Sequence, residues 1–280
     1  MRCGRVLLLL LPLSLQAPAL RPARGGGVSA GQGSQQGSGP VFIQEPANKV
    51  DFSNSSGVTV LCAAHGDPPP TLSWLLDDGS VAADVPRLRR MLHNGSLHLP
   101  AFAADEYRAD VHATSYRCRA SSSAGTILSR RVRLRAVVRQ HYEVQVYDEF
   151  VILGNTAVLR CHVPSFVREY VTVTGWVRGG DQRILGDADT GGRYSVFPTG
   201  ELHIREARAE DGAASYRCET RHRLTGETRL SSVSGRVVVA PPQSSVPPRV
   251  TDSRSVVSGR VKDSLELPCA AQGSPAPEYR

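Results

Sequence analysis

Hydrophobic and polar residues alternate in short runs along this chain of 280 residues. Val58, Val60 and Cys62 fall on one face of such a run, and Tyr116 and Cys118 fall on one face of another. An alternation with a period of two, bounded by clusters of Gly, Pro, Asn and Asp, predicts half-buried β-strands. The pattern recurs downstream at Ala157, Leu159, Cys161, Tyr216 and Cys218. The chain is therefore expected to be all-β, with two copies of one unit.

Each copy contains a cysteine, a tryptophan and a Tyr-x-Cys motif in the same order. The residues are Cys62, Trp74, Tyr116 and Cys118 in the first copy and Cys161, Trp176, Tyr216 and Cys218 in the second. This order is typical of the immunoglobulin sandwich, where the tryptophan packs on a disulfide between two sheets and the tyrosine forms a corner. We expect tandem immunoglobulin-like β-sandwiches of the I-set type. The expected disulfides are Cys62–Cys118 and Cys161–Cys218, and both tryptophans and both tyrosines are expected in the cores.

The N-terminus has the pattern of an export signal. Basic residues precede an apolar run from Val6 to Leu15, and Ala17-Pro18-Ala19 has the small-x-small form of a cleavage site. The run is too short to cross about 30 Å of hydrocarbon as a helix. Residues 1–19 are predicted to be a signal peptide, followed by a flexible Gly/Ser/Gln-rich segment at residues 20–39.

The domain boundaries follow from the repeats and from proline content. The two immunoglobulin-like domains are predicted at residues 40–138 and 139–240. The Pro-rich residues 241–248 are predicted to form an extended, semi-rigid linker.

The last part of the chain repeats the beginning of a sandwich. Val261 to Cys269 has the alternation of a strand that leads to a first cysteine, so residues 249–280 are interpreted as the truncated start of a third domain. The chain has six cysteines, and Cys3 would leave with the signal peptide. Cys269 is therefore expected to be unpaired by truncation.

Catalytic and metal-binding motifs are not found in the sequence. It contains no GxSxG, HExxH or phosphate-binding GxxxxGK pattern, and no zinc-type Cys/His spacing. We expect a protein that is not an enzyme, with no catalytic or metal site and no cofactor. The formal net charge is +7, which suits several acidic partners. Export argues against nucleic acid as one of them.

Two surface features have candidate roles. Asn54 and Asn94 each begin an Asn-x-Ser triplet, the acceptor of N-linked glycans in exported chains. Arg131, Arg133 and Arg135 alternate along one predicted strand, which places them about 6–7 Å apart on one face. That face is either a solvated outer surface or a groove for a sulfated glycan or an acidic partner.

The chain resembles the N-terminal immunoglobulin domains of the Down syndrome cell adhesion molecule (Dscam) family, in particular its arthropod members. The stretches that carry the resemblance are GPVFIQEP (Gly39–Pro46), DFSNSSG (Asp51–Gly57), SSSAGTILSR (Ser121–Arg130), RAVV (Arg135–Val138), VPSFVREYV (Val163–Val171), GELHIRE (Gly200–Glu206) and SYRCETRHRLTGETRLS (Ser215–Ser231). The resemblance implies a neuronal cell-surface receptor with many extracellular modules and one membrane span. It also implies homophilic recognition between opposing cells, used in self-avoidance and axon guidance.

In the family, the second domain meets its counterpart through an antiparallel edge strand that precedes the first core cysteine. By resemblance, the candidate strand in this chain consists of Gln145, Val146, Tyr147, Asp148, Glu149, Phe150 and Val151. Edge strands offer unpaired backbone groups, which makes them suitable for self-pairing about a two-fold axis. The alternatives are a secreted or immune-type binder of foreign ligands and a glycan-binding co-receptor. The expected location is the secretory pathway and, for the full-length protein, the extracellular face of the plasma membrane, with no membrane span expected in this part of the chain.

Overall fold

The computed structural model describes residues 37–184, 192–262, 265 and 267–279. The predicted signal peptide and most of the Gly/Ser/Gln-rich segment lie outside the described residues. The chain divides between Gln140 and His141 into two compact units. We call residues 37–140 domain 1 and residues 141–240 domain 2. None of the described helices is long and apolar enough to cross a membrane.

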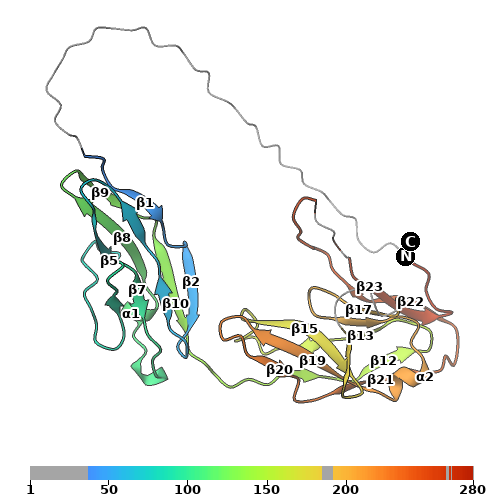
Figure 1. The fold of residues 1–280 in the computed structure, drawn as a ribbon. Helices are drawn as coiled ribbons and strands as arrows, with labels where there is room; N and C mark the ends of the chain where they lie inside the picture. The colour runs from blue at the N-terminus through green and yellow to red at the C-terminus, as the bar shows by residue number, and fades with distance from the viewer. Residues whose placement is uncertain (1–36, 185–191, 263–264, 266, 280) are drawn as a thin grey trace, which may run out of the picture. The chain divides into compact units, whose positions relative to one another are not determined.

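Domain 1 packs two main layers of strands against each other (Figure 1). One sheet has the order β2 (Lys49–Ser53), β10 (Val132–Val137), β8 (Ser115–Ser122) and β5 (Thr71–Leu75), and β9 (Gly125–Leu128) also pairs with β8. The other consists of β3 (Val58–Val60), β7 (Leu97–Leu99) and β6 (Arg90–Met91). A separate pair joins β1 (Val41–Gln44) to β4 (Ala63–His65), and the short helices are η1 (Ala104–Glu106) and α1 (Ala109–His112). β2 runs parallel to β10, and the other pairs are antiparallel.

Domain 2 repeats this arrangement with one more strand in its larger sheet. That sheet has the order β12 (Glu149–Ile152), β21 (Gly235–Ala240), β19 (Ser215–His222), β15 (Val171–Arg178) and β16 (Gln182–Ile184), and β20 (Thr228–Leu230) also pairs with β19. The facing strands are β13 (Ala157–Leu159), β18 (Leu202–Ile204) and β17 (Tyr194–Val196), with a separate pair of β11 (Gln145–Val146) and β14 (Cys161–His162). Helix α2 (Ala209–Gly212) precedes β19. The predicted all-β fold is thus confirmed.

Each core is built around a disulfide and a tryptophan. The structure joins Cys62 to Cys118 and Cys161 to Cys218. Trp74 and Trp176 are both 1% exposed. Each indole N–H donates to the carbonyl of a glycine in a turn of the facing sheet. Trp74 donates to Gly95, before β7, at 2.8 Å, and Trp176 donates to Gly200, before β18, at 3.0 Å.

The two glycines that receive these bonds cannot be replaced without strain. Gly95 and Gly200 have φ of 83° and 97°, in the left-handed region that other residues rarely adopt. A Cβ on Gly95 would lie 2.2 Å from Leu72, and one on Gly200 would lie 2.6 Å from Val173. The Asn-Gly and Thr-Gly pairs in the sequence therefore mark turns on which the tryptophans are fixed.

The tyrosines form the expected corners. The hydroxyl of Tyr116 donates to the carbonyl of Val111 at 2.9 Å, and that of Tyr216 donates to the carbonyl of Asp211 at 3.3 Å. Both tyrosines are fully buried. Each bond satisfies a hydroxyl that burial would otherwise leave without a partner.

The C-terminal part forms a hairpin of β22 (Val246–Ser253) and β23 (Cys269–Ser274). The start of β22 corrects the predicted linker, because Val246, Pro247 and Pro248 belong to this strand. Its register shifts between Val246 and Arg249, and prolines are tolerated at such irregular edge positions because they need not donate to the ladder.

The expectation for Cys269 is also corrected. Cys269 is disulfide-bonded in the structure, and its partner lies outside the described residues. The expected unpaired thiol followed from a cysteine count that left out Cys3.

Candidate recognition surface of domain 2

The candidate edge segment, Gln145 to Val151, is not one continuous strand. Gln145 and Val146 form β11, which pairs with β14, whereas β12 pairs with β21 in the other sheet. The backbone at Val144–Val146 is bonded on its second side as well, because Ser232 N–H donates to Val144 and Val146 N–H donates to Val233. The predicted open edge is therefore wrong for residues 145–146. In the described residues, β12 is the end strand of the larger sheet of domain 2.

The outer edge of β12 is covered by one side chain from the C-terminal hairpin. The N–H of Ile152 donates to Oε1 of Gln272 at 3.1 Å, and Nε2 of Gln272 donates to the carbonyl of Phe150 at 3.0 Å. The carboxamide thus makes the two bonds that a neighbouring strand would make. The sequence could not predict this contact, because nothing in the hydrophobic pattern indicates that Gln272 and β12 are neighbours.

Two aromatic side chains protrude from the same segment. Phe150 is 70% exposed and Tyr147 is 56% exposed, between Val146 and Val151, which are buried. The Tyr147 hydroxyl donates to Gln145 Oε1 at 2.7 Å, and its ring lies 4.6 Å from that of His162. The buried valines anchor the segment while the aromatic rings face solvent. Rigid aromatic side chains of this kind dominate the energetics of many interfaces.

Of the two acidic residues of the segment, Asp148 has a hydrogen-bond partner and Glu149 is half-buried. Asp148 Oδ1 accepts a hydrogen bond from the backbone N–H of Arg236 at 2.8 Å. Burial raises the pKa of Glu149, with a further contribution from nearby Asp252, while Arg160 acts in the opposite direction. The segment therefore does not present two free carboxylates side by side.

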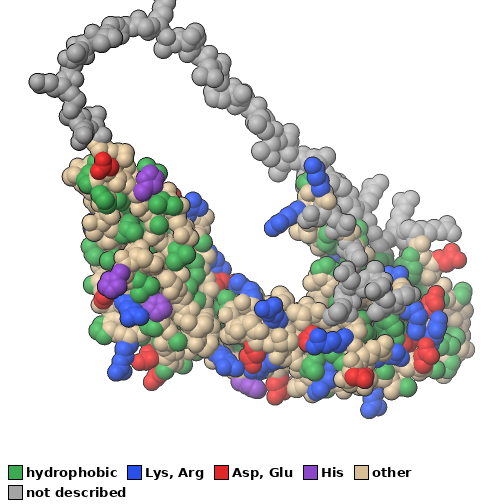
Figure 2. All heavy atoms as spheres, viewed as in Figure 1, with side chains coloured by type: hydrophobic (Ala, Val, Ile, Leu, Met, Phe, Trp, Pro, Cys, Tyr) green, Lys and Arg blue, Asp and Glu red, His purple; other side chains and the backbone are tan. Residues whose placement is uncertain are grey.

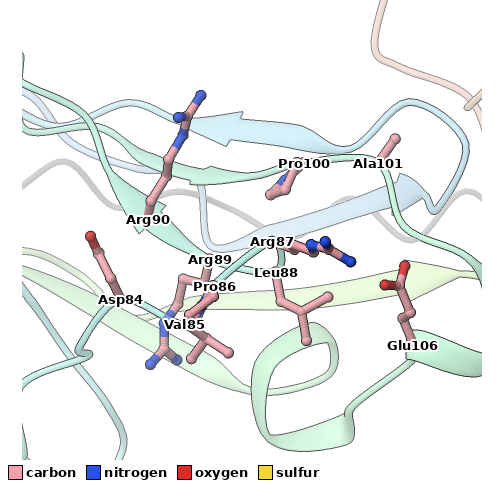
Figure 3. A pocket seen from close by; sticks show the side chains of 10 residues that line it. All are labelled: Asp84, Val85, Pro86, Arg87, Leu88, Arg89, Arg90, Pro100, Ala101 and Glu106. Atoms are coloured by element: carbon pink, nitrogen blue, oxygen red, sulfur yellow. The ribbon is translucent and has the colours of Figure 1, made fainter.

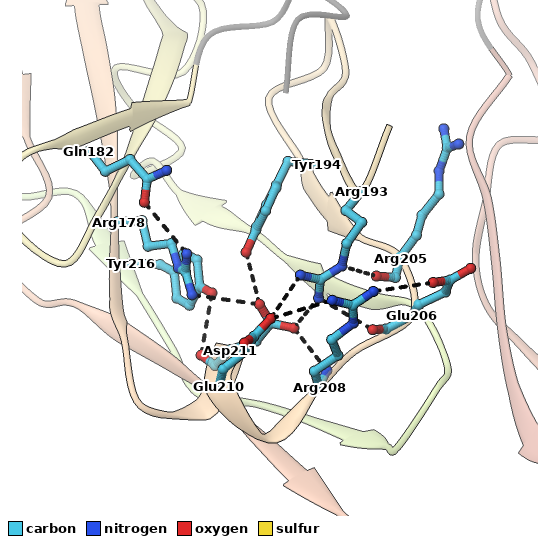
Figure 4. Close-up of polar contacts among 10 residues, drawn as sticks. All are labelled: Arg178, Gln182, Arg193, Tyr194, Arg205, Glu206, Arg208, Glu210, Asp211 and Tyr216. Carbon is cyan, nitrogen blue, oxygen red and sulfur yellow. Dashed lines mark hydrogen bonds and ion pairs between the residues drawn. The ribbon is translucent and has the colours of Figure 1, made fainter. Parts of the chain in front are cut away.

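Asp211 is fully buried and joins a cluster of polar side chains in domain 2, which we call the base (Figure 4). Arg193 Nη2 donates to Asp211 Oδ2 at 2.5 Å, and the backbone N–H of Arg208 donates to the same oxygen at 2.8 Å. Asp211 Oδ1 accepts from the hydroxyl of Tyr194 at 2.8 Å, and Arg178 lies 3.8 Å from it. Burial, together with the bond to Asp211, raises the pKa of Tyr194.

The predicted basic row of domain 1 is largely neutralised. Arg135 makes two bonds to Asp51, at 3.0 and 3.1 Å, and Arg131 lies 3.1 Å from Asp77. Arg133 is exposed and has no acidic partner among the described residues. Elsewhere, cationic and anionic side chains are interspersed on the visible face of domain 2 (Figure 2). A free row of three guanidinium groups is therefore not present.

A separate surface pocket in domain 1 lies around the loop before β6. It has an apolar floor of Val85 and Leu88, with Asp84 on one side and Arg87 and Glu106 on the other (Figure 3). In the described part of the chain, no three His, Cys, Asp or Glu side chains are placed to hold a metal ion. The pocket brings together no nucleophile and base of the kind that catalysis needs.

Comparison with known proteins identifies the family. Residues 148–231 match the immunoglobulin domain family. The chain is 47% identical over 245 residues to the cell adhesion molecule Dscam1 of Drosophila melanogaster, covering 86% of this chain and 12% of the relative. It is 38% identical over 241 residues to the cell adhesion molecule DSCAM of Homo sapiens, covering 85% of this chain and 12% of that relative. The chain thus spans only a small part of the length of these relatives.

Solved structures give the same result for the fold. The crystal structure of the N-terminal four Ig domains of Dscam1 isoform 9.44 matches with a TM-score of 0.78 and 43% identity, covering 86% of this chain and 62% of that one. A structure described as "Structural basis for Dscam isoform specificity" matches with a TM-score of 0.72 and 46% identity, covering 85% and 62%. These sandwiches and these matches identify the chain as a member of the Dscam family, corresponding to its N-terminal immunoglobulin domains.

Proposed function

We propose that this chain is the N-terminal recognition region of a cell-surface adhesion receptor, exported through the secretory pathway and displayed outside the cell. It has no enzymatic activity in this proposal, and its partner is a second copy on an opposing cell. The relatives are named as cell adhesion molecules, and one similar structure is described in terms of isoform specificity. A role in neuronal self-avoidance and axon guidance is part of the same proposal.

The observation that carries the proposal is the exposed pair Tyr147 and Phe150 on the candidate segment. An interface between identical copies related by a two-fold axis is self-complementary, so each residue acts on both sides of the contact. Two protruding rings per copy supply apolar area, and the buried valines beside them fix the rings in place. Gln272 occupies the backbone groups of Phe150 and Ile152, so the proposed contact is made mainly by side chains.

The test is aggregation of beads that carry the ectodomain through a complete fourth domain. Phe150→Glu introduces a charge twice at a two-fold contact, and we expect self-association to weaken by roughly 30-fold, or about 2 kcal/mol. Tyr147→Glu should act in the same direction. Phe166→Glu is the matched control, because Phe166 is a 54% exposed aromatic residue of domain 2 outside the segment.

The outcomes separate the candidate functions. Loss of aggregation with Phe150→Glu but not with Phe166→Glu supports homophilic contact through this segment. Parent beads that remain dispersed contradict homophily and favour a soluble or immune-type binder of foreign ligands.

A second candidate, binding of a sulfated glycan, is favoured by the environment of Arg133. This residue lines a polar hollow with Arg131, Asn48, Asp77, Thr114 and Ser115. Arg133→Gln is expected to elute from a heparin column at clearly lower salt than the parent, because counterion release scales with the cations engaged. Arg135→Gln should change elution less, because Asp51 already neutralises that guanidinium. Equal elution of parent and Arg133→Gln would remove this candidate.

A further inference from the structure

The two Asn-x-Ser triplets of domain 1 place their asparagines in opposite environments. Asn54 lies in the turn between β2 and β3 and is half-buried, whereas Asn94 lies in the turn between β6 and β7 and is exposed. N-linked glycans are bulky and are attached to the side-chain nitrogen, Nδ2. The surroundings of that atom therefore decide which triplet is compatible with a glycan in the folded protein.

All four polar groups of Asn54 are bonded within domain 1. Its backbone N–H donates to Val137 at 3.1 Å, and its carbonyl accepts from Phe102 N–H at 2.9 Å. In the side chain, Nδ2 donates to the carbonyl of Phe102 at 3.0 Å, and Oδ1 accepts from Arg139 N–H at 2.8 Å. A sugar could replace only the second hydrogen of Nδ2, on a carboxamide that the bonds to Phe102 and Arg139 hold in place.

Domain 2 has the same device at a residue that cannot be glycosylated. The carbonyl of Asn155 accepts from Ala207 N–H at 2.8 Å, in the way that Asn54 accepts from Phe102. Its carboxamide bonds both sides of Gly273, with Nδ2 donating to the carbonyl at 3.0 Å and Oδ1 accepting from the N–H at 2.9 Å. Asn155 is 3% exposed, and Asn155-Thr156-Ala157 is not an acceptor triplet.

The repetition indicates what this position does. In both domains, an asparagine before the strand that leads to the first cysteine uses its carboxamide to bond a later part of the chain. For Asn54 that part is Arg139, where the chain leaves domain 1, and for Asn155 it is Gly273 in β23. Because the second copy has the bonds without the triplet, the shared role is structural.

Asn94 has the opposite arrangement. Its Oδ1 accepts from Ser96 N–H at 3.0 Å, and the turn is closed by bonds between Leu92 and Ser96 and between Gly95 and Leu92. Within the described residues, Nδ2 of Asn94 has no hydrogen-bond partner, so it is free to carry a substituent. A shallow surface pocket adjoins it, lined in part by Pro70, Leu72 and Met91, of which Met91 is 44% exposed.

We infer that the exported protein carries an N-linked glycan on Asn94 and none on Asn54, whose carboxamide fixes the exit of domain 1. The first sugars on Asn94 cover Met91 and the pocket beside it. One face of domain 1 is therefore shielded by carbohydrate and takes no part in contacts with other proteins.

The test uses the full chain secreted from eukaryotic cells. Its peptides are mapped by mass spectrometry after enzymatic removal of N-glycans in heavy-oxygen water, which converts each glycosylated asparagine to labelled aspartate. We expect label in the peptide with Asn94 and unlabelled Asn54. This map comes from the parent protein, so it does not depend on the folding of any variant. Labelled Asn54, or unlabelled Asn94, would overturn the inference.

Three variants separate the glycan from the structural role. Asn94→Gln should lose one glycan mass and keep its melting temperature within a few degrees. Asn54→Gln should keep the same glycan mass but melt roughly 4–8 °C lower, because the two side-chain hydrogen bonds to Phe102 and Arg139 are lost. Asn48→Gln, an exposed asparagine outside any acceptor triplet, is the matched control and should change neither. A loss of glycan mass in Asn54→Gln would contradict the assignment.

Discussion

Replacing Asp211 with asparagine is expected to lower the free energy of unfolding of domain 2 by about 3–5 kcal/mol. Asparagine has nearly the same shape, but it removes the negative charge that Arg193 faces at 2.5 Å. It also replaces an acceptor oxygen, so one of the bonds from Arg193, Arg208 or Tyr194 is lost. Arg193 keeps Glu210 at 3.4 Å but loses its buried carboxylate partner, and this loss accounts for most of the cost.

Denaturant unfolding of the purified chain checks this expectation. Asp181→Asn is the matched control, because Asp181 is exposed in the turn between β15 and β16 and should change stability by less than about 0.5 kcal/mol. A cost of Asp211→Asn as small as that of the control would contradict the assignment of Asp211 as the organising residue of the base.

The pH dependence of this effect has a definite sign. Burial raises the pKa of Asp211, but the bonds from the Arg208 backbone, Tyr194 and Arg193 outweigh burial, and the pKa lies below its ordinary value of 3.8. A carboxyl with a lowered pKa contributes stability above its unfolded pKa, and that contribution is lost as the pH falls through the folded pKa. The difference between parent and Asp211→Asn should therefore be full at neutral pH and shrink in strong acid.

Removing the disulfide of domain 2 should have a comparable effect. Cys161 and Cys218 are separated by 57 residues, and the chain-entropy relation gives about 4 kcal/mol for a loop of that size. Since whole domains are stable by only about 5–15 kcal/mol, the double variant Cys161→Ala/Cys218→Ala should unfold at much lower denaturant. Calorimetry or denaturant unfolding would measure this shift.

The matching variant in the other sandwich serves as the control. Cys62→Ala/Cys118→Ala removes the disulfide that closes a loop of nearly the same length, since the two cysteines are separated by 56 residues. It should lower the denaturant concentration at which domain 1 unfolds and leave that of domain 2 unchanged. If both double variants moved the same transition, the two sandwiches would not be independent units. A shift of less than about 1 kcal/mol would show that packing around Trp176 outweighs the bridge.

The sequence could predict the parts of this fold that rest on local pattern. Cys161, Trp176 and Tyr216 occur in the order that is typical of an immunoglobulin sandwich, so the burial of Trp176 and Tyr216 followed from the order of residues. The ion pair of Arg193 with Asp211 could also be anticipated, because an immunoglobulin sandwich places both residues at the same end of the domain, which is the base. In each case the partners are fixed by the fold type and not by details of the surface.

Other features depend on which distant residues become neighbours. Arg135 and Asp51 are 84 residues apart, and only the parallel pairing of β10 with β2 brings them together, so the basic row looked free in the sequence. The alternation in Gln145–Val151 likewise does not reveal that the segment changes sheets after Val146. Period-two patterning identifies the inward face of a strand, but it contains no information about which strand lies beside it.

The carboxamide of Gln272 on β12 also limits how many molecules one contact can join. A sheet edge with unoccupied backbone groups accepts one strand after another, and such growth ends in fibres. With Phe150 and Ile152 already bonded, the sheet of domain 2 cannot be lengthened at that point. A contact made by side chains about a two-fold axis is closed after one partner. Under the proposed function, each copy of the chain would then bind one partner at this surface, so the number of contacts between two cells could not exceed the number of copies on either cell.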